Sequence, residues 1–188
     1  MKESRLIKFL KKLLTEVSTI MLGLLLALAL NSWKEDKDRE HNAKVLVASI
    51  NKEIKKNYQS VLNLKKNLDI QVQKNDSLIS LYEEGVIKTL GIVTITHKLQ
   101  SVAWKSANAS EDFSVIPSPT LIGMAKVYEE QERADLIMKS IDNYYINNNP
   151  EQSSLTRSKI KQNHMKELLS RCKDLERRYK EYTEAIKI

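Results

Sequence analysis

The chain has 188 residues with only 4 Gly and 3 Pro, so it favours long helices over a many-stranded β fold. Its one cysteine, Cys172, excludes an internal disulfide and a multi-cysteine zinc site, and its place on an apolar helical stripe predicts a core residue. The net charge of +7 lies at the two ends of the chain, without the interleaved aromatics of a nucleic-acid module. We therefore exclude nucleic acid as the main partner.

An apolar segment, residues 13–33, lies near the N-terminus and holds a charge-free run from Val17 to Leu30. A helix of about 20 residues crosses the roughly 30 Å of bilayer hydrocarbon, and Trp33 stands where an interfacial anchor is expected. Residues 1–12 carry five basic residues and one acidic residue, whereas residues 34–40 carry three and four. The positive-inside rule therefore predicts a signal anchor in a bacterial inner membrane, with residues 1–12 cytoplasmic and the chain beyond Trp33 periplasmic.

A cleaved signal peptide is the alternative interpretation of this segment. Ala27-Leu28-Ala29 is a small-x-small pattern that would permit cleavage after Ala29. Glu16 argues against cleavage because it interrupts the transition into the apolar run, and no turn separates that run from the polar residues that follow. The anchor is the favoured interpretation.

Four residues are candidates for contact with another membrane helix: Glu16, Gly23, Asn31 and Trp33. An acid within a membrane segment is costly, so Glu16 is a functional candidate by default. Its structural alternative is an ion pair with Lys12, four residues earlier, at the cytoplasmic interface. Gly23 would let a partner helix approach closely.

These residues also carry a resemblance. Glu16, Gly23, Ala27, Asn31 and Trp33 fall in register with the N-terminal segment of a family of uncharacterised single-pass membrane proteins from Bacteroidota, defined by a domain of unknown function. A second, looser likeness covers the region from Ala103 to Tyr128, where Asn108 and Glu111-Asp112 replace the family's usual Gly. The resemblance implies a membrane anchor and a helical periplasmic domain, and it implies no activity.

Residues 34–188 predict an all-α extracytoplasmic domain, either a four-helical bundle with long helices or a coiled-coil-like structure. Helices are expected over about 34–84, 92–106, 118–146 and 152–188, in an up-down-up-down order. The charged residues after Trp33 either stand free as a stalk or continue the membrane helix. Phe113, Val115 and Ile116 should turn inward, with Ser118 as the N-cap of the third helix and Pro119 as its first residue.

The last predicted helix has apolar residues three and four positions apart. We expect this stripe to contact a protein partner or a second copy of the chain, through Leu168, Cys172, Leu175, Tyr179 and Tyr182.

No catalytic or cofactor motif stands out. The histidines, His41, His97 and His164, are far apart in the sequence, and no phosphate loop or nucleophile motif occurs. Trp104, Lys105, Tyr144, Tyr145, Tyr179 and Tyr182 could line a ligand groove, although core aromatics are the better interpretation. We expect no metal, no cofactor and no enzyme activity.

The predicted function is a non-enzymatic membrane-anchored scaffold or accessory subunit that acts through helix-mediated protein contacts. The alternative is a ligand-sensing or transport-linked helical module, coupled through the membrane helix to a partner.

Overall fold

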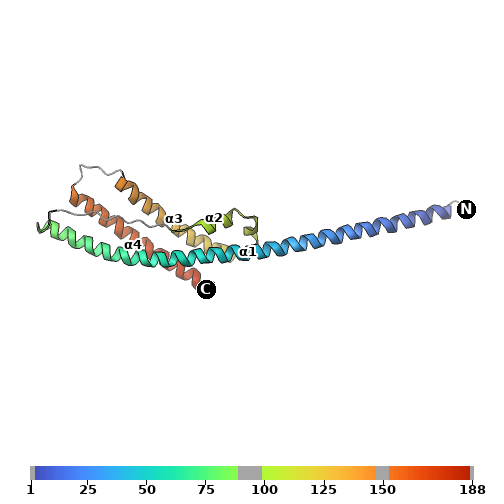
Figure 1. Cartoon of the computed structure of the whole chain (residues 1–188), viewed down its shortest axis with the longest axis horizontal. Coiled ribbons are helices and arrows are strands. Elements are labelled where there is room, and N and C mark those ends of the chain that lie inside the picture. The colour runs from blue at the N-terminus through green and yellow to red at the C-terminus, as the bar shows by residue number, and fades with distance from the viewer. Residues whose placement is uncertain (1–2, 89–98, 147–152, 187–188) are drawn as a thin grey trace.

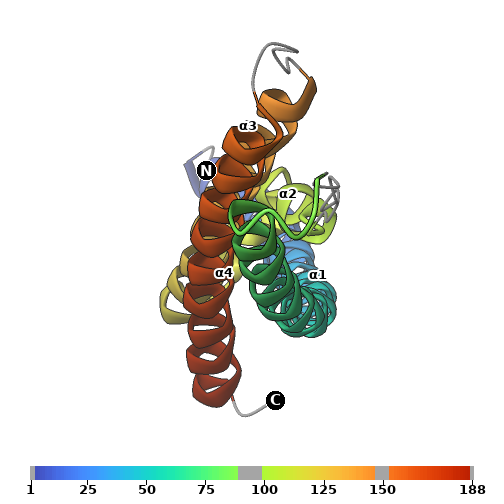
Figure 2. The same cartoon turned by 90° about the vertical axis from the view of Figure 1, so that its left-hand side faces the viewer.

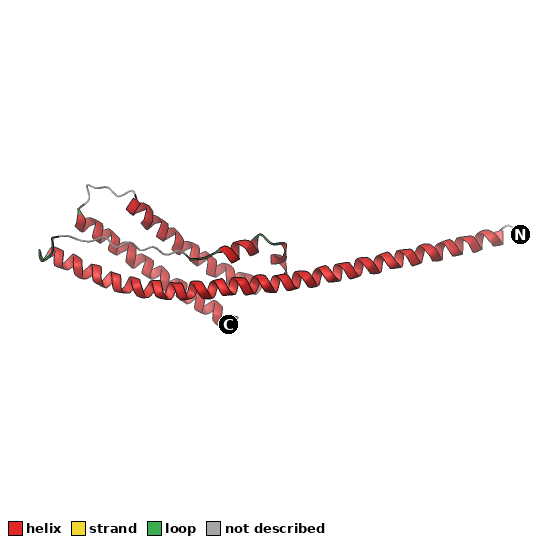
Figure 3. Ribbon diagram, in the orientation of Figure 1, coloured by secondary structure: helices red, strands yellow, loops and turns green. Residues whose placement is uncertain are grey.

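The computed structural model describes residues 3–88, 99–146 and 153–186. This part of the chain is all-α, as predicted, and contains no strand. The elements are α1 (Glu3–Glu83), α2 (Val102–Asn108), the 3-10 helix η1 (Glu111–Val115), α3 (Ser118–Ile146) and α4 (Ser154–Ala185) (Figure 3). The second predicted helix is wrong over residues 99–101, which are not helical; the part from 92 to 98 lies outside the described residues.

The apolar segment and the first helix of the domain are one continuous helix (Figure 1). At 1.5 Å per residue α1 is about 120 Å long. Its N-terminal part is long and apolar enough to cross a membrane. Every residue from Ile7 to Asn42 is exposed, and Ala43 is the first buried one. The charged residues after Trp33 therefore both continue the apolar part of α1 and stand free as a stalk.

A left-handed turn ends α1. Gly85 has φ of 75°, a conformation that glycine adopts without a steric penalty. The amide of Gly85 donates to the Tyr82 carbonyl at 3.1 Å, and that of Val86 donates to the Leu81 carbonyl at 2.9 Å. These bonds satisfy carbonyls that the end of a helix leaves without partners.

α4 packs antiparallel against both α1 and α3 (Figures 1 and 2). Ion pairs fix the register between α1 and α4: Lys65 with Glu176, Asp76 with Lys166 at 3.4 Å, and Glu83 with Lys159 at 2.6 Å. α3 runs parallel to α1, and the short α2 runs antiparallel to α1. The predicted up-down-up-down order is therefore confirmed, although α2 supplies only about two turns.

The core forms where these helices meet. Its fully buried side chains include Ile50, Ile54, Leu68, Met124, Met165 and Leu168. Each such side chain contributes about 1.5–3 kcal/mol by leaving water.

The predicted partner stripe belongs to this core, so the prediction that it contacts a partner is wrong for the folded chain. Its exposed fractions are 1% for Leu168, 1% for Cys172, 1% for Leu175, 0% for Tyr179 and 5% for Tyr182. The helical spacing was correct, but α1 and α3 of the same chain already cover this face. The core position predicted for Cys172 is confirmed, and burial raises the pKa of its thiol to about 12.

The segment before α3 follows the prediction only in part. Ile116 is buried and Phe113 packs against the core, but Val115 is 38% exposed. The Pro117 carbonyl accepts bonds from the amides of Thr120 at 3.0 Å and Leu121 at 3.1 Å. Pro117 thus takes the capping position that we expected for Ser118, and Ser118 is already helical.

Candidate coupling site between the N-terminal helix and the domain

The four membrane-helix candidates stay apart from the domain. The Glu16 carboxylate lies 3.9 Å from the Lys12 ammonium. This is the ion pair with Lys12 that we gave as the structural alternative to a functional role for Glu16. The Asn31 amide donates to the Glu35 carboxylate at 2.7 Å, and Trp33 is 63% exposed. A Cβ added to Gly23 would meet nothing within 4 Å. The surface of α1 around Gly23 is therefore open.

The open face around Gly23 points away from the bundle. Glu16, Thr19 and Gly23 share one face of α1 because they are spaced by three and four residues. Gly23 and the core residue Ile50 are 27 residues apart, which is about seven and a half turns. The extra half turn puts these two residues on opposite sides of α1. The domain thus lies on one side of α1, and the Glu16–Gly23 face lies on the other.

Within the domain, Glu53 joins α1 to two other elements. Its carboxylate accepts bonds from the backbone amides of Ala103 at 2.9 Å and Trp104 at 3.4 Å, and from the Tyr128 hydroxyl at 2.6 Å. Ser101, at the N-cap position of α2, makes no side-chain cap bond. Glu53 therefore caps α2 from a different helix.

The three bonds satisfy a carboxylate that is only 8% exposed. Such a group is costly to bury unless donors surround its oxygens. Burial and the hydrogen bond to Glu53 raise the pKa of the Tyr128 phenol well above its usual range. Tyr128 thus stays a proton donor to Glu53 at neutral pH.

One turn further along α1, the side chain of Asn57 binds the backbone of Gln100 through two hydrogen bonds. Its side-chain amide donates to the Gln100 carbonyl at 2.7 Å, and its oxygen accepts from the Gln100 amide at 3.0 Å. Gln131 of α3 donates to the same carbonyl at 2.8 Å and accepts from the Tyr179 hydroxyl of α4 at 3.0 Å. Asn57 and Gln131 are each 2% exposed, whereas Gln100 itself is exposed, so this polar contact is partly buried at the edge of the bundle. We call Glu53, Asn57, Tyr128 and Gln131 the polar clamp.

A cleft of about 360 Å³ lies between α2 and α3, beside the polar clamp. The Trp104 ring stacks on Tyr128 with centroids 4.9 Å apart and planes 8° apart, and Phe113 meets it edge-on at 5.7 Å. Charges of both signs line the rest of the cleft: Lys105, Lys139, Glu129, Glu132 and Asp135. Mixed charges beside an aromatic wall suit a small polar ligand.

The favoured interpretation of these aromatics as core residues is confirmed for Tyr179 and Tyr182, whereas Trp104 and Lys105 line the cleft. Tyr179 and Tyr182 lie in the core, and Tyr144 packs edge-on against His164 with centroids 5.4 Å apart. The side chain of Tyr145 lies outside the described residues.

A second hollow of about 490 Å³ separates α1 from the η1–α3 corner, at the end of the domain from which the exposed N-terminal half of α1 projects. Small and apolar side chains dominate its walls, among them Ala43, Val47, Ala48, Ile116 and Pro117. Sequence periodicity did not find it, because Ala43 and Val47 belong to the same stripe as the core of α1.

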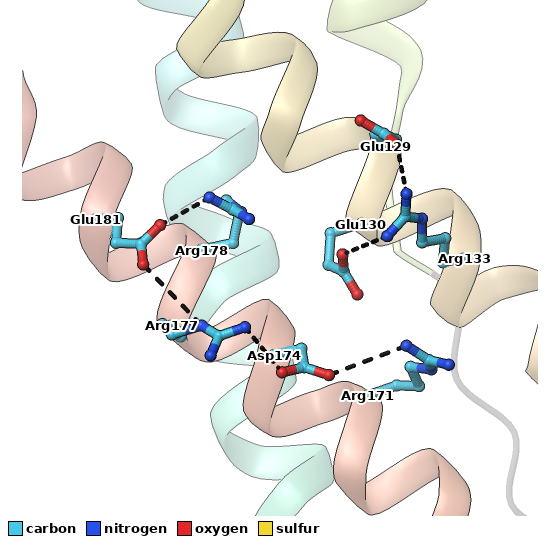
Figure 4. A network of polar contacts seen from close by, with 8 residues as sticks. All are labelled: Glu129, Glu130, Arg133, Arg171, Asp174, Arg177, Arg178 and Glu181. Atoms are coloured by element: carbon cyan, nitrogen blue, oxygen red, sulfur yellow. Dashed lines mark hydrogen bonds and ion pairs between the residues drawn. The ribbon is translucent and has the colours of Figure 1, made fainter.

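The exposed charges of α3 and α4 pair mostly within their own helix (Figure 4). Arg133 lies 2.6 Å from Glu129 and 3.5 Å from Glu130, and Arg178 lies 2.8 Å from Glu181. Surface pairs of this spacing contribute about 0.3–0.5 kcal/mol each. We therefore assign these charges to support of the helices rather than to a site.

Within the described residues, no group of three His, Cys, Asp or Glu could hold a metal ion. His41 is exposed, His164 is half-buried, and His97 lies outside the described part. No family model, curated protein or solved structure matches the chain. The resemblance of the N-terminal segment to the Bacteroidota family stays a prediction.

Proposed function

We propose that the chain is a membrane-anchored scaffold or accessory subunit of a bacterial inner membrane. Residues 1–12 would lie in the cytoplasm and the helical domain in the periplasm, as the charge difference across the span favours. The observation that carries the proposal is the unbroken helix α1, which is fully exposed from Ile7 to Asn42 and then becomes one wall of the bundle. A rod of this kind holds a domain at a fixed height above the bilayer.

The proposed partner is another membrane protein. The apolar stripe of α4 is buried in the core of the same chain and is not available to a partner. The apolar part of α1 is exposed and therefore offers the contact face. The face of Glu16, Thr19 and Gly23 combines small and polar residues, which drive association in lipid by close packing and hydrogen bonding. It also points away from the bundle, so a partner helix can approach without meeting the domain.

The test is purification of the tagged full-length protein in mild detergent, with co-purifying proteins quantified by mass spectrometry. We expect one stoichiometric membrane partner, whose yield falls in Gly23→Leu and in Glu16→Gln. Ser18→Leu is the matched control, because it also enlarges a small residue but lies about 140° away from Gly23 around α1. A wild-type protein that purifies alone as a monomer contradicts the proposal.

The second candidate function is a ligand-sensing or transport-linked module, and it rests on the cleft between α2 and α3. Trp104 lines this cleft, stacks on Tyr128, and donates its amide to Glu53. A ligand that shifts α2 would thus act directly on the helix that enters the membrane. A thermal-shift screen of small polar compounds tests this function. It predicts a hit whose shift disappears in Trp104→Leu and persists in Val102→Ala, because Val102 is 72% exposed and does not line the cleft.

A further inference from the structure

The second hollow, between α1 and the η1–α3 corner, has the dimensions of a site for one alkyl chain. Its lining on α1 extends from Glu40 to Asn51, which is about 16 Å along the helix. Its volume of about 490 Å³ falls within the range of about 300–1,000 Å³ that is usual for small-molecule sites. Over that length the mean cross-section is about 30 Å². A helix with its side chains is about 10–12 Å across, so the hollow is too narrow for a helix of a partner protein.

Apolar side chains form the walls of this hollow, and part of that surface is exposed. Ile116 is 3% exposed and Ala43 is 6% exposed, so these two side chains form its floor. Val115 is 38% exposed, and Ala48 is exposed on the side of α1. Contiguous apolar surface of this kind marks a binding site, because a ligand that covers it removes it from water.

Three polar side chains of the lining can donate hydrogen bonds into the hollow. Among the described residues, no ion pair or hydrogen bond reaches the Lys44 ammonium. Glu40, one turn before it, pairs instead with Lys37 at 2.9 Å. The oxygen of Asn51 accepts a bond of 2.8 Å from a tyrosine of α4, which leaves its amide as a donor. The Thr120 hydroxyl likewise has no partner in the described part of the chain.

The lining thus combines apolar walls with a positive charge and neutral donors, and its one acid is already paired. We propose that this hollow binds a single-chain anionic amphiphile, a long-chain carboxylate of the fatty-acid class. The alkyl chain lies along α1, between Ala48 and the η1–α3 corner, where the walls are apolar. The carboxylate pairs with the Lys44 ammonium, because charge-assisted hydrogen bonds are the strong ones. A mostly apolar site with a few placed polar groups is the usual form of a small-molecule site.

The distance of the hollow from Trp33 favours a single-chain molecule over a phospholipid of the bilayer. This step rests on the proposed function, which places Trp33 at the membrane interface. Glu40 is the part of the lining closest to Trp33 along α1, and it lies seven residues beyond it, or about 10 Å. Headgroups extend only about 5–8 Å beyond the hydrocarbon on each side. A phospholipid with one chain in the hollow would therefore hold its second chain in water, which is unfavourable.

The test is photolabelling of the full-length protein in phosphatidylcholine nanodiscs, with a myristate that carries a diazirine near the end of its chain. We expect saturable labelling of residues 43–51 and 115–120, located by mass spectrometry of the peptides and displaced by unlabelled myristate. Displacement by octanoate, decanoate and laurate should strengthen about fourfold for each added methylene, because each one leaves water. Ala48→Leu fills the hollow and should abolish the labelling. Ser49→Leu is the matched control, because Ser49 is also small and exposed on α1 but does not line the hollow.

Lys44→Met is the second variant, and it keeps the proposal testable if Ala48→Leu disturbs α1. Loss of the charged partner should weaken labelling by the carboxylate about tenfold or more, and should leave labelling by the matching fatty alcohol unchanged. Lys56→Met is its control, because Lys56 is exposed on the same helix and does not line the hollow. These variants keep the Glu16–Gly23 face, so they should not change the yield of a membrane partner. Failure of this proposal is thereby distinguishable from failure of the proposed function.

Labelling that is confined to residues 13–33, or that is equal in the wild type, Ala48→Leu and Ser49→Leu, overturns the proposal. Equal labelling of the wild type and Lys44→Met by the carboxylate contradicts the anionic head. Labelling of the hollow by a photoreactive phosphatidylcholine of the disc would assign it to a bilayer lipid instead. A wild-type dimer that Ala48→Leu converts to a monomer, without labelling of the hollow, would assign it to a second copy of the chain.

Discussion

Glu53 accepts a hydrogen bond of 2.6 Å from the Tyr128 hydroxyl while the same carboxylate caps α2. The long helix α1, which contains the candidate membrane span, is thereby bonded to α2 and α3 through one side chain. A neighbouring side chain, Asn57, joins the same helix to the Gln100 backbone and to Gln131 of α3. Motion of the domain relative to α1 would have to break these buried bonds, so the domain and the rod should move as one body.

Tyr128→Phe should destabilise the folded chain by about 1.5–3 kcal/mol, because it removes a buried hydrogen bond to a charged acceptor. Glu53 would keep its two backbone donors. The measurement is urea unfolding of the protein in detergent. Tyr82→Phe is the control, since the Tyr82 hydroxyl is half-buried and accepts only a 3.5 Å bond from Ser154. If the two substitutions lower the free energy of unfolding equally, the Tyr128 hydroxyl adds no special stability, and Tyr128 acts through the packing of its ring alone.

Leu175→Ala should cost about 2–5 kcal/mol of folding free energy, because the leucine is 1% exposed and its loss leaves a cavity. Leu136→Ala, at 58% exposure, should change stability by less than about 0.5 kcal/mol. Unfolding monitored by circular dichroism measures both. If Leu175→Ala instead keeps wild-type stability and loses a bound partner, the apolar stripe of α4 contacts that partner after all.

Periodicity predicted the class and the order of the long helices because each has an apolar face with a period near 3.6 residues. The same signal gave α3 and α4 to within a few residues of their ends. It failed just before α2, where the backbone of Gln100 bonds to side chains from α1 and α3 instead of to a helix of its own. The backbone conformation there depends on residues more than 30 positions away.

The polar clamp shows why the candidate site escaped prediction. Glu53 and Asn57 look like ordinary polar residues of an amphipathic helix, and each lies next to an apolar position, Ile54 or Tyr58. Their burial depends on the crossing of α1 with α2 and α3, which no local pattern encodes. The same limit explains the C-terminal stripe: sequence spacing shows that a face is apolar, but not whether the same chain covers it.

Alkaline pH should unfold the protein through its buried tyrosines. Burial raises the pKa of Tyr182 to about 12, and that of Tyr128 and Tyr179 further still. Since the unfolded phenols ionise near pH 10, the unfolded chain releases protons first. The stability from these groups is therefore complete below pH 10 and is lost as the pH rises from 10 toward 12.

Phenolate absorbance measured together with circular dichroism checks this prediction. Of the 7 tyrosines, Tyr128, Tyr179 and Tyr182 should ionise only as the helices unfold. Tyr182→Phe should reduce the steepness of the stability loss above pH 10, because it removes one of the coupled protons. If all seven phenols titrate near pH 10 while the protein stays folded, the buried environment assigned to these rings is wrong.

The intact mass of the membrane-extracted protein separates the anchor from a cleaved signal peptide. We expect the full 21.7 kDa chain, because the small-x-small pattern at Ala27 and Ala29 lies in the middle of an unbroken helix. The double substitution Ala27→Leu with Ala29→Leu removes the pattern and keeps the segment apolar, so it should leave the mass unprocessed and the protein in the membrane. A wild-type protein that begins at Leu30, together with a full-length double variant, would contradict the anchor. The domain would then be a released helical protein. The Glu16–Gly23 face would then be lost with the signal peptide, and the α2–α3 cleft would become the main candidate for function.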